Sequence, residues 1–487
     1  MSKNVPRIVF FLGPISFLAI NFLWEPSGLE SKALAVMALA IWMAVWWISE
    51  AIPISATALL PLLVLPLTGS LNMDQAAAPY ADPMVLLYMG GFMIAVTIEK
   101  WHLHKRIALS IIAYIGTDMR FIVLGFMVAT AFLSMWISNT ATSLMMLPIG
   151  VAVVHQLGEG NSKQSISETS MGRALMLAIA YSASIGGVAT IIGTPTNIVF
   201  AGIVKELYGV DISFAKWMLI GLPISICLLG LCWWYLVNRA YHFPKGQKYS
   251  GGHKEILRQL HELGKMTVPE KRVLLVFALV SFCWISRVFL LQGFLPFLND
   301  TIIALGGVVL LFVLPANKTK ARLLDWKTAE NIPWGILILF GGGLSLAAGF
   351  KETGLASWLG SHFEALISIP FLLFLLVIVA SVNFLTEITS NVATASMLLP
   401  ILGSVAAALG IHPYGLMVGA TLAASCAFML PVATPPNAVV FGSGYLTIPA
   451  MAKAGFWMNI LSIILITLFV YFLLPLVWGI DLNSSFE

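Results

Sequence analysis

The chain has 487 residues, of which 59% are hydrophobic and only 10% are charged. Because soluble domains carry about 25% charged residues, this composition excludes an ordinary soluble protein and indicates a chain that folds in lipid. The net charge of +4 is not gathered on one soluble basic face, which argues against nucleic-acid binding.

The N-terminal apolar stretch, residues 8–24, follows Lys3 and Arg7 and lacks an A-x-A cleavage site, so it is interpreted as a first span with a cytoplasmic N-terminus. The positive-inside rule places all but five of the 26 basic residues in the cytoplasm. The exceptions, which we place outside together with the C-terminus, are Lys32, Lys205, Lys216, Arg287 and Lys351. A location in the plasma (inner) membrane is expected.

A helix needs about 20 apolar residues to cross the hydrocarbon core. Spans are predicted at residues 7–24, 33–50, 53–69, 84–99, 214–237, 273–292, 299–315, 333–350 and 455–478. Residues 158–172 are predicted to form a polar loop, and the basic segment 239–272, with Gly251-Gly252, a cytoplasmic linker between two halves. The expected fold is an all-α polytopic membrane protein with about 11 transmembrane helices.

Four apolar regions are interrupted by polar or proline-containing motifs. Residues 121–157 break at Ser138-Asn139-Thr140 and residues 367–409 at Thr389-Ser390-Asn391, and their short arms favour two re-entrant hairpins. Residues 174–206 break at 193–197 and residues 414–443 at 433–437. Since proline cannot continue a helix without loss, these two regions are predicted to be discontinuous helices.

The interruptions occur in matching pairs. Residues 138–142 (SNTAT) recur as 390–394 (SNVAT), and residues 194–197 (TPTN) recur as 434–437 (TPPN). Five predicted crossings separate the two hairpins, and five is odd, so the hairpins would enter from opposite faces. Inverted repeats with broken helices near the bilayer midplane are typical of secondary transporters.

The duplicated breaks predict one binding site for a small anion and sodium. Open backbone persists in a membrane only where it is buried in protein or lines a cavity. Helix N-termini favour an anion, whereas carbonyl and side-chain oxygens suit a hard cation. No Lys, Arg or His occupies the four motifs, so bound cations would have to offset the charge of the substrate.

Other polar or small residues have simpler interpretations. Gly90-Gly91 and Gly341 to Gly343 are expected to allow close helix packing. Glu387 is expected to be a hydrogen-bonded structural carboxylate, with a proton or cation ligand as the alternative. The four cysteines lie in apolar segments without ligand spacing, so small core residues are favoured over a disulfide or a metal site.

These motifs resemble the divalent anion:sodium symporter family of sodium dicarboxylate, citrate and sulfate carriers. The run Ala424-Ser425, Phe428, Pro431-Val432-Ala433, Asn437 and Val439-Val440 is similar to the signature of that family, and the tips resemble its paired Ser-Asn-Thr. The resemblance implies two sodium sites, formed by Ser134, Ser138, Asn139 and Gly193, and by Thr386, Thr389, Asn391 and Ala433. It implies substrate contacts at Asn139, Thr140, Thr194, Pro195, Asn391, Val392, Thr434 and Pro435.

The resemblance further implies a homodimer, surrounded by membrane lipid, that works as an elevator. The scaffold would comprise residues 1–118 and 273–366, and the moving transport part residues 119–238 and 367–487. Val392 departs from the family pattern because it replaces the second tip's Thr. Succinate, malate and fumarate are the expected substrates, ahead of citrate and sulfate.

Other functions remain open. A sodium-independent or proton-coupled exchanger would use the same fold. An intramembrane enzyme would need a HExxH, a GxGD or a Ser/His pair at membrane depth, whereas the eight histidines lie in or beside predicted loops. A channel would seldom need paired hairpins.

Overall fold

The computed structural model describes residues 7–116, 118–158, 164–243, 250–317, 321–362 and 369–486. Within these ranges the protein is built from helices, and Pro315 and Arg322 form an isolated β-bridge. Eight helical stretches there are long and apolar enough to cross a membrane. An all-α membrane fold, as the composition predicted, is therefore confirmed at that level.

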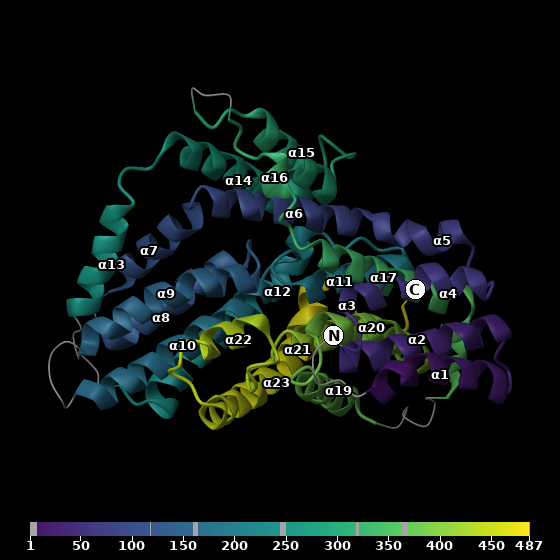
Figure 1. Ribbon diagram of the computed structural model, residues 1–487. Coiled ribbons are helices and arrows are strands. Elements are labelled where there is room, and N and C mark those ends of the chain that lie inside the picture. Colours follow the sequence, from purple (N-terminus) through teal and green to yellow (C-terminus); the bar gives the residue numbers. More distant parts are fainter. Residues whose placement is uncertain are drawn as a thin grey trace.

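The first half of the chain runs from two paired helices through the first interrupted regions to a π-helical end. In Figure 1, α8 and α9 lie beside α10, and α1 lies against α2 at the opposite edge. The elements are α1 (Arg7–Leu23), α2 (Ser31–Ser49), α3 (Ile54–Thr57), α4 (Leu60–Leu67), α5 (Met73–Ala77), η1 (Ala78–Ala81), α6 (Pro83–Lys100), α7 (Leu103–Ile115), α8 (Met119–Ser134), α9 (Asn139–Gly158), α10 (Gln164–Val188), α11 (Pro195–Tyr208), α12 (Phe214–Tyr235) and η2 (Leu236–Ala240).

The second half also contains two interrupted regions, in the same order, and ends with α23, the longest helix of the described residues. Its elements are α13 (Ser250–Glu262), α14 (Val268–Ser286), η3 (Arg287–Leu291), α15 (Asp300–Val313), α16 (Trp326–Ala329), α17 (Trp334–Glu352), α18 (Leu355–Ser361), α19 (Phe371–Leu385), α20 (Asn391–Ala408), α21 (Pro413–Ala424), α22 (Pro435–Phe441) and α23 (Ile448–Trp478).

Two predictions of secondary structure, the loop at residues 158–172 and the single span at residues 53–69, were wrong. The polar loop at residues 158–172 is mostly the start of α10, which begins at Gln164; residues 159–163, with Lys163, lie outside the described residues. The predicted linker at residues 239–272 contains α13, which packs against α7 and α9, and residues 244–249 lie outside the described residues; its role as a cytoplasmic linker stays a prediction. The span at residues 53–69 is divided into α3 and α4, and Pro61 lies in the first turn of α4, where a missing N–H costs nothing.

Helix α6 shows how charge is distributed between its two ends. Asp82, directly before the helix, lies 3.8 Å from the Lys205 ammonium, whereas Lys100 at its last turn lies 2.6 Å from Asp325. The sequence placed Lys205 outside and Lys100 inside, so both ion pairs respect the predicted division. The contacts agree with a helix that crosses between two charged surfaces.

The glycine pairs lie at close helix contacts, as predicted. A Cβ on Gly90 would lie 2.8 Å from the Ala304 Cβ of α15, and one on Gly342 would lie 2.3 Å from the Ala58 carbonyl oxygen. Neither contact leaves room for a side chain. These glycines therefore set the spacing of α6 and α17 against their neighbours rather than contributing ligands.

Candidate functional site

Both tips and both helix breaks open onto one cavity of about 880 Å³. All eight residues predicted to contact substrate line it, as do four of the residues predicted to bind sodium only. The predicted residues on its wall are Ser138, Asn139, Thr140, Gly193, Thr194, Pro195, Thr389, Asn391, Val392, Ala433, Thr434 and Pro435. Positions about 250 residues apart in the chain therefore meet at one place.

The first tip is the non-helical turn between α8 and α9. Helix α8 ends at Ser134, and α9 begins at Asn139. Ser134 is fully buried behind the tip, where its hydroxyl donates to Asn139 Oδ1 at 2.5 Å and lies 2.7 Å from the Ala183 carbonyl of α10. The Ser138 hydroxyl accepts from the Ala141 N–H, as a helix N-cap does.

The second tip repeats this arrangement between α19 and α20. The Thr386 hydroxyl, also fully buried, donates to Asn391 Oδ1 at 2.7 Å and lies 3.1 Å from the Ala424 carbonyl. The Thr389 hydroxyl lies 2.6 Å from that of Thr394. Ser134 and Thr386 thus play the same part in the two halves: each ties a tip asparagine to the end of the neighbouring broken helix.

The two helix breaks have nearly the same backbone geometry. Thr194 has φ −137° and ψ 143°, Thr434 has φ −142° and ψ 150°, and a proline follows each as the first residue of α11 or α22. The hydroxyl of Thr434 accepts from the N–H of Asn437, whereas that of Thr194 makes no such cap. The Thr194 hydroxyl lies instead 3.4 Å from that of Thr196, so the two breaks hold this threonine differently.

Two buried asparagines hold the breaks open, a role that was not assigned from the sequence. The Asn197 amide donates to the carbonyls of Val188 and Thr190 at 3.2 and 2.8 Å. The Asn437 amide donates in the same way to the carbonyls of Ala427 and Leu430, at 3.2 and 3.0 Å. The signal was present in the duplicated TPTN and TPPN motifs, whose last residue is this asparagine.

Glu387 is the structural carboxylate that the sequence favoured. It is 3% exposed, and its Oε1 accepts from the N–H groups of Phe428 and Met429 at 2.7 and 2.9 Å and from the Asn459 amide at 2.8 Å. Its Oε2 accepts from the Leu430 N–H at 3.1 Å. These four donors account for the carboxylate without a cation or a transported proton.

Oxygen atoms converge on Asn139. When its amide is turned by half a rotation, the nitrogen donates to Ser134 Oγ at 2.5 Å and to the Ala183 and Gly193 carbonyls at 3.2 Å. When the amide oxygen points inward instead, four oxygens face one another. A hydroxyl, an amide oxygen and two carbonyls are ligands that suit a hard cation.

The opposite wall of the cavity was not predicted from the sequence. It consists mostly of apolar or small residues from the end of α2, from α3, from α6 and from the start of α17. Glu50, which has a left-handed φ of 48°, is exposed at its rim. This wall lacks interrupted motifs, so the sequence offered no sign that it faces the duplicated breaks.

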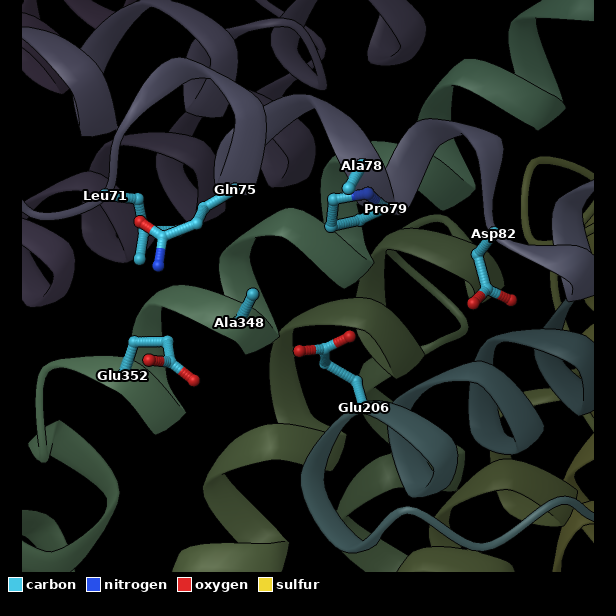
Figure 2. Close-up of a pocket in the computed structure, with 8 residues that line it drawn as sticks. All are labelled: Leu71, Gln75, Ala78, Pro79, Asp82, Glu206, Ala348 and Glu352. Atoms are coloured by element: carbon cyan, nitrogen blue, oxygen red, sulfur yellow. The ribbon is translucent and has the colours of Figure 1, made fainter.

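A second, smaller cavity of about 290 Å³ has the opposite electrostatic character. Figure 2 shows the carboxylates of Glu206 and Glu352 directed toward the space between α11 and α17, with Asp82 nearby. Three carboxylates so close together would repel a dianion. The larger cavity, whose lining includes one carboxylate and no Lys, Arg or His, is the better anion site.

Comparison with known proteins identifies relatives over nearly the whole chain. Residues 7–479 match the family model described as "Sodium:sulfate symporter transmembrane region". The Sodium-dependent dicarboxylate transporter SdcS of Staphylococcus saprophyticus is 49% identical over 492 residues, which cover 99% of this chain and 94% of that relative. The protein of the same name from Staphylococcus aureus is 47% identical over 485 residues, covering 98% and 93%.

Two solved transporters share the fold at low sequence identity. Neisseria gonorrhoeae MtrF aligns with a TM-score of 0.56 and 11% identity over 96% of this chain and 94% of its own. The Alcanivorax borkumensis YdaH transporter aligns with a TM-score of 0.59 and 14% identity over 85% and 89%. At this identity the likeness concerns the fold alone.

Proposed function

The chain belongs to the sodium:sulfate symporter family, and from that premise we propose that it is a sodium-coupled symporter of small dianions. C4 dicarboxylates such as succinate, malate and fumarate are the proposed substrates, because two relatives at 47–49% identity are named as sodium-dependent dicarboxylate transporters. Sodium is the proposed co-transported ion.

The observation that carries the proposal is the single cavity between the two tips and the two breaks. The N-termini of α9, α11 and α20 begin at Asn139, Pro195 and Asn391, on its wall. Unpaired N–H groups and the helix dipole favour negative charge at such ends. Two carboxylates of one substrate could therefore be met by the two halves of the repeat, one at each tip.

Sodium coupling is proposed because the cavity wall carries no side-chain cation. A dianion brought there would face neutral groups and the Glu50 carboxylate at the rim. The oxygens around Asn139 and the matching hydroxyl of Thr386 beside Asn391 offer a cation position behind each tip. A sodium ion at each position would stabilise the substrate, and the substrate would in turn favour sodium binding.

Val392 makes the proposed substrate site asymmetric. Thr140 supplies a hydroxyl at the first tip, whereas Val392 supplies only methyl groups at the second. A substrate with two carboxylates and a short apolar linker suits such a site better than one that needs hydroxyls at both ends. The same reasoning ranks succinate above citrate and sulfate.

Alternating access is proposed to occur by an elevator movement. Residues 119–238 and 367–487 would move as the transport part, carrying both tips and both breaks, against a scaffold formed by residues 1–118 and 273–366. The mostly apolar wall contributed by α6 and α17 supports this division, since an apolar surface makes few directional bonds that would resist sliding. A homodimer in the plasma membrane, with the N-terminus inside and the C-terminus outside, completes the proposal.

Uptake into proteoliposomes tests the coupling. Labelled succinate should accumulate when sodium is imposed on one side and should not accumulate when choline replaces sodium. Undiminished accumulation without sodium, with or without a proton gradient, would favour a sodium-independent or proton-coupled exchanger instead. Competition by unlabelled succinate, citrate and sulfate then ranks the substrates, and stronger competition by sulfate than by succinate would contradict the proposed preference.

A further inference from the structure

A third cavity, of about 630 Å³, shares no lining residue with the cavity of about 880 Å³ that forms the proposed substrate site. It is formed where the first turns of the apolar part of α10, the end of α12 with η2, and the first turns of α23 come together. Its lining residues are Arg173, Trp234, Tyr235, Arg239, Ala240, Tyr241, Ala450, Lys453, Ala454, Trp457 and Leu461.

The charge of this cavity is positive throughout. Arg173, Arg239 and Lys453 each come from a different helical element, and no carboxylate is among the lining residues. Within the described part of the chain, none of the three takes part in an ion pair. Three cations held close together without a counter-charge repel one another, so a bound anion would lower the free energy of the folded protein.

Arg173 gives a more specific sign of a ligand. Its Nε is completely buried, yet it has no hydrogen-bond partner in the described structure. Leaving a charged donor buried and unpaired is costly, and native proteins usually satisfy such groups. An anionic oxygen in the cavity would provide the missing acceptor.

The cavity also has the aromatic lining of a membrane interface. Trp234 and Trp457 are 46% and 53% exposed, and the Arg239 guanidinium lies 5.7 Å from the centre of the Trp234 ring. Tryptophan is enriched where hydrocarbon meets lipid headgroups. Leu461, the lining residue farthest along α23, extends the apolar side from this interface toward the middle of the helix.

The end of α12 is shaped to widen this site. Residues Leu236–Ala240 form a π-helix, the wider helical turn that often occurs at functional sites. Arg239 belongs to this turn, and Tyr241 directly after it also lines the cavity. The wider turn changes the direction of these side chains relative to a regular continuation of α12.

We propose that this cavity binds the phosphate-bearing headgroup of an anionic phospholipid, with the acyl chains lying along Trp457 and Leu461. Basic pockets between transmembrane helices are known to hold such headgroups on the cytoplasmic side. The positive-inside assignment places Arg173, Arg239 and Lys453 on that side. The transported dianion is a poorer occupant, because the apolar half of the cavity offers nothing to a second carboxylate.

Lipid binding to purified protein in detergent tests the proposal. Native mass spectrometry and thermal unfolding would be measured with added phosphatidylglycerol, with phosphatidylcholine and with inorganic phosphate. Phosphatidylglycerol should bind at least about tenfold more tightly than phosphatidylcholine and should raise the Tm, as expected for charge-assisted hydrogen bonds. Inorganic phosphate alone should not reproduce the rise in Tm.

Variants then locate the binding. The double variant Arg239→Gln/Lys453→Gln should lose about tenfold in affinity for phosphatidylglycerol, whereas Arg239→Lys/Lys453→Arg should keep most of it. Lys327→Gln, which removes an exposed charge outside the cavity, is the matched control and should bind as the wild type does. Equal binding of the two lipids, or unchanged phosphatidylglycerol binding in the glutamine double variant, would overturn the proposal. A full effect of phosphate alone would show that the site takes a free anion and not a lipid.

Discussion

The hydroxyls of Thr196 and Ser425 lie 2.6 Å apart, and both side chains are buried. Thr196 belongs to the first turn of α11, and Ser425 follows the last residue of α21. One hydrogen bond therefore joins the helix break of the first half to the helix break of the second half. It fixes the two breaks relative to each other beside the proposed site.

A double-mutant cycle measures this connection. Thr196→Val and Ser425→Ala each remove one hydroxyl and leave the other without its best partner, so each should lower the free energy of unfolding. The double variant should lose less than the sum of the two, by about 1 kcal/mol. Denaturant titration in detergent gives the free energy of unfolding of the two single variants and of the double variant, each compared with the wild type.

Thr196→Val combined with Ser286→Ala is the control for that cycle. Ser286 donates to Phe282 within α14 and shares no partner with Thr196. The two changes should be additive. A coupling of zero between Thr196 and Ser425 would mean that the two breaks are positioned by other contacts.

The sequence was most informative where it departed from an apolar pattern. Asn139, Asn391, Pro195 and Pro435 stand out in long apolar runs, and their duplication indicated that the four breaks belong together. The structure places all four residues on one cavity. Polar groups and prolines destabilise a membrane helix, so their presence in an apolar run indicates a functional site even without a structure.

Helix α13 and the apolar wall of the cavity could not be predicted from the sequence, because both depend on how distant segments pack. The polar, basic segment with Gly251-Gly252 gave no sign of a helix, yet α13 forms there against α7 and α9. The apolar wall around Ile336 and Phe92 has the composition of any lipid-facing surface, so its place beside the site depends on how distant helices meet. Tertiary contacts override local propensity in both cases.

Asn139→Ala and Asn391→Ala should each abolish transport without unfolding the protein. Each asparagine lies on the cavity wall and accepts from a hydroxyl behind its tip, so alanine removes an oxygen from the proposed cation position and an amide from the proposed substrate site. Succinate uptake at subsaturating concentration should fall by about a hundredfold.

Asn331→Ala is the control for the tip variants. Asn331 is exposed outside the cavity, and its side-chain amide donates to the Lys327 carbonyl of α16 at 2.8 Å. Succinate uptake by the Asn331→Ala variant, and its elution profile in size-exclusion chromatography, should equal those of the wild type. Wild-type uptake by both tip variants would show that the substrate site lies elsewhere.

Gly193→Ala should impair both folding stability and transport. A Cβ at this position would lie 2.4 Å from the Gly187 carbonyl oxygen and 2.9 Å from the Gly187 Cα, both backbone atoms that cannot turn aside. Relieving such a contact typically costs about 1–3 kcal/mol, and here it would shift the break that carries Thr194. The Tm in detergent and the rate of succinate uptake should both fall.

Gly230→Ala provides the contrasting change. Gly230 lies within α12, and a Cβ there would meet nothing within 4 Å. Alanine is a better helix former than glycine by about 1 kcal/mol, so this variant should be as stable as the wild type or more so. A similar loss of Tm in both variants would contradict the argument from backbone contact at Gly193.

Glu387→Gln distinguishes a structural carboxylate from an ion ligand. Glu387 accepts from three backbone N–H groups, those of residues 428–430 in the segment between α21 and α22, and from the Asn459 amide of α23. It therefore ties that segment to α23. Glutamine keeps the shape but offers one acceptor oxygen in place of two and adds a donor that faces other donors. Since hydrogen bonds to a charged group contribute about 1.5–3 kcal/mol each, the loss should be about 3 kcal/mol.

If Glu387 is structural, the Glu387→Gln variant should lose stability without a change in the sodium dependence of its transport. The Tm should fall markedly, while the sodium concentration that gives half-maximal uptake by the remaining folded protein should stay unchanged, because no sodium ligand has been altered. Glu352→Gln, an exposed carboxylate at the smaller cavity, should leave both quantities unchanged. An unaltered Tm together with a shifted sodium or pH dependence would instead assign Glu387 to ion binding, and the four donors around it would then need another explanation.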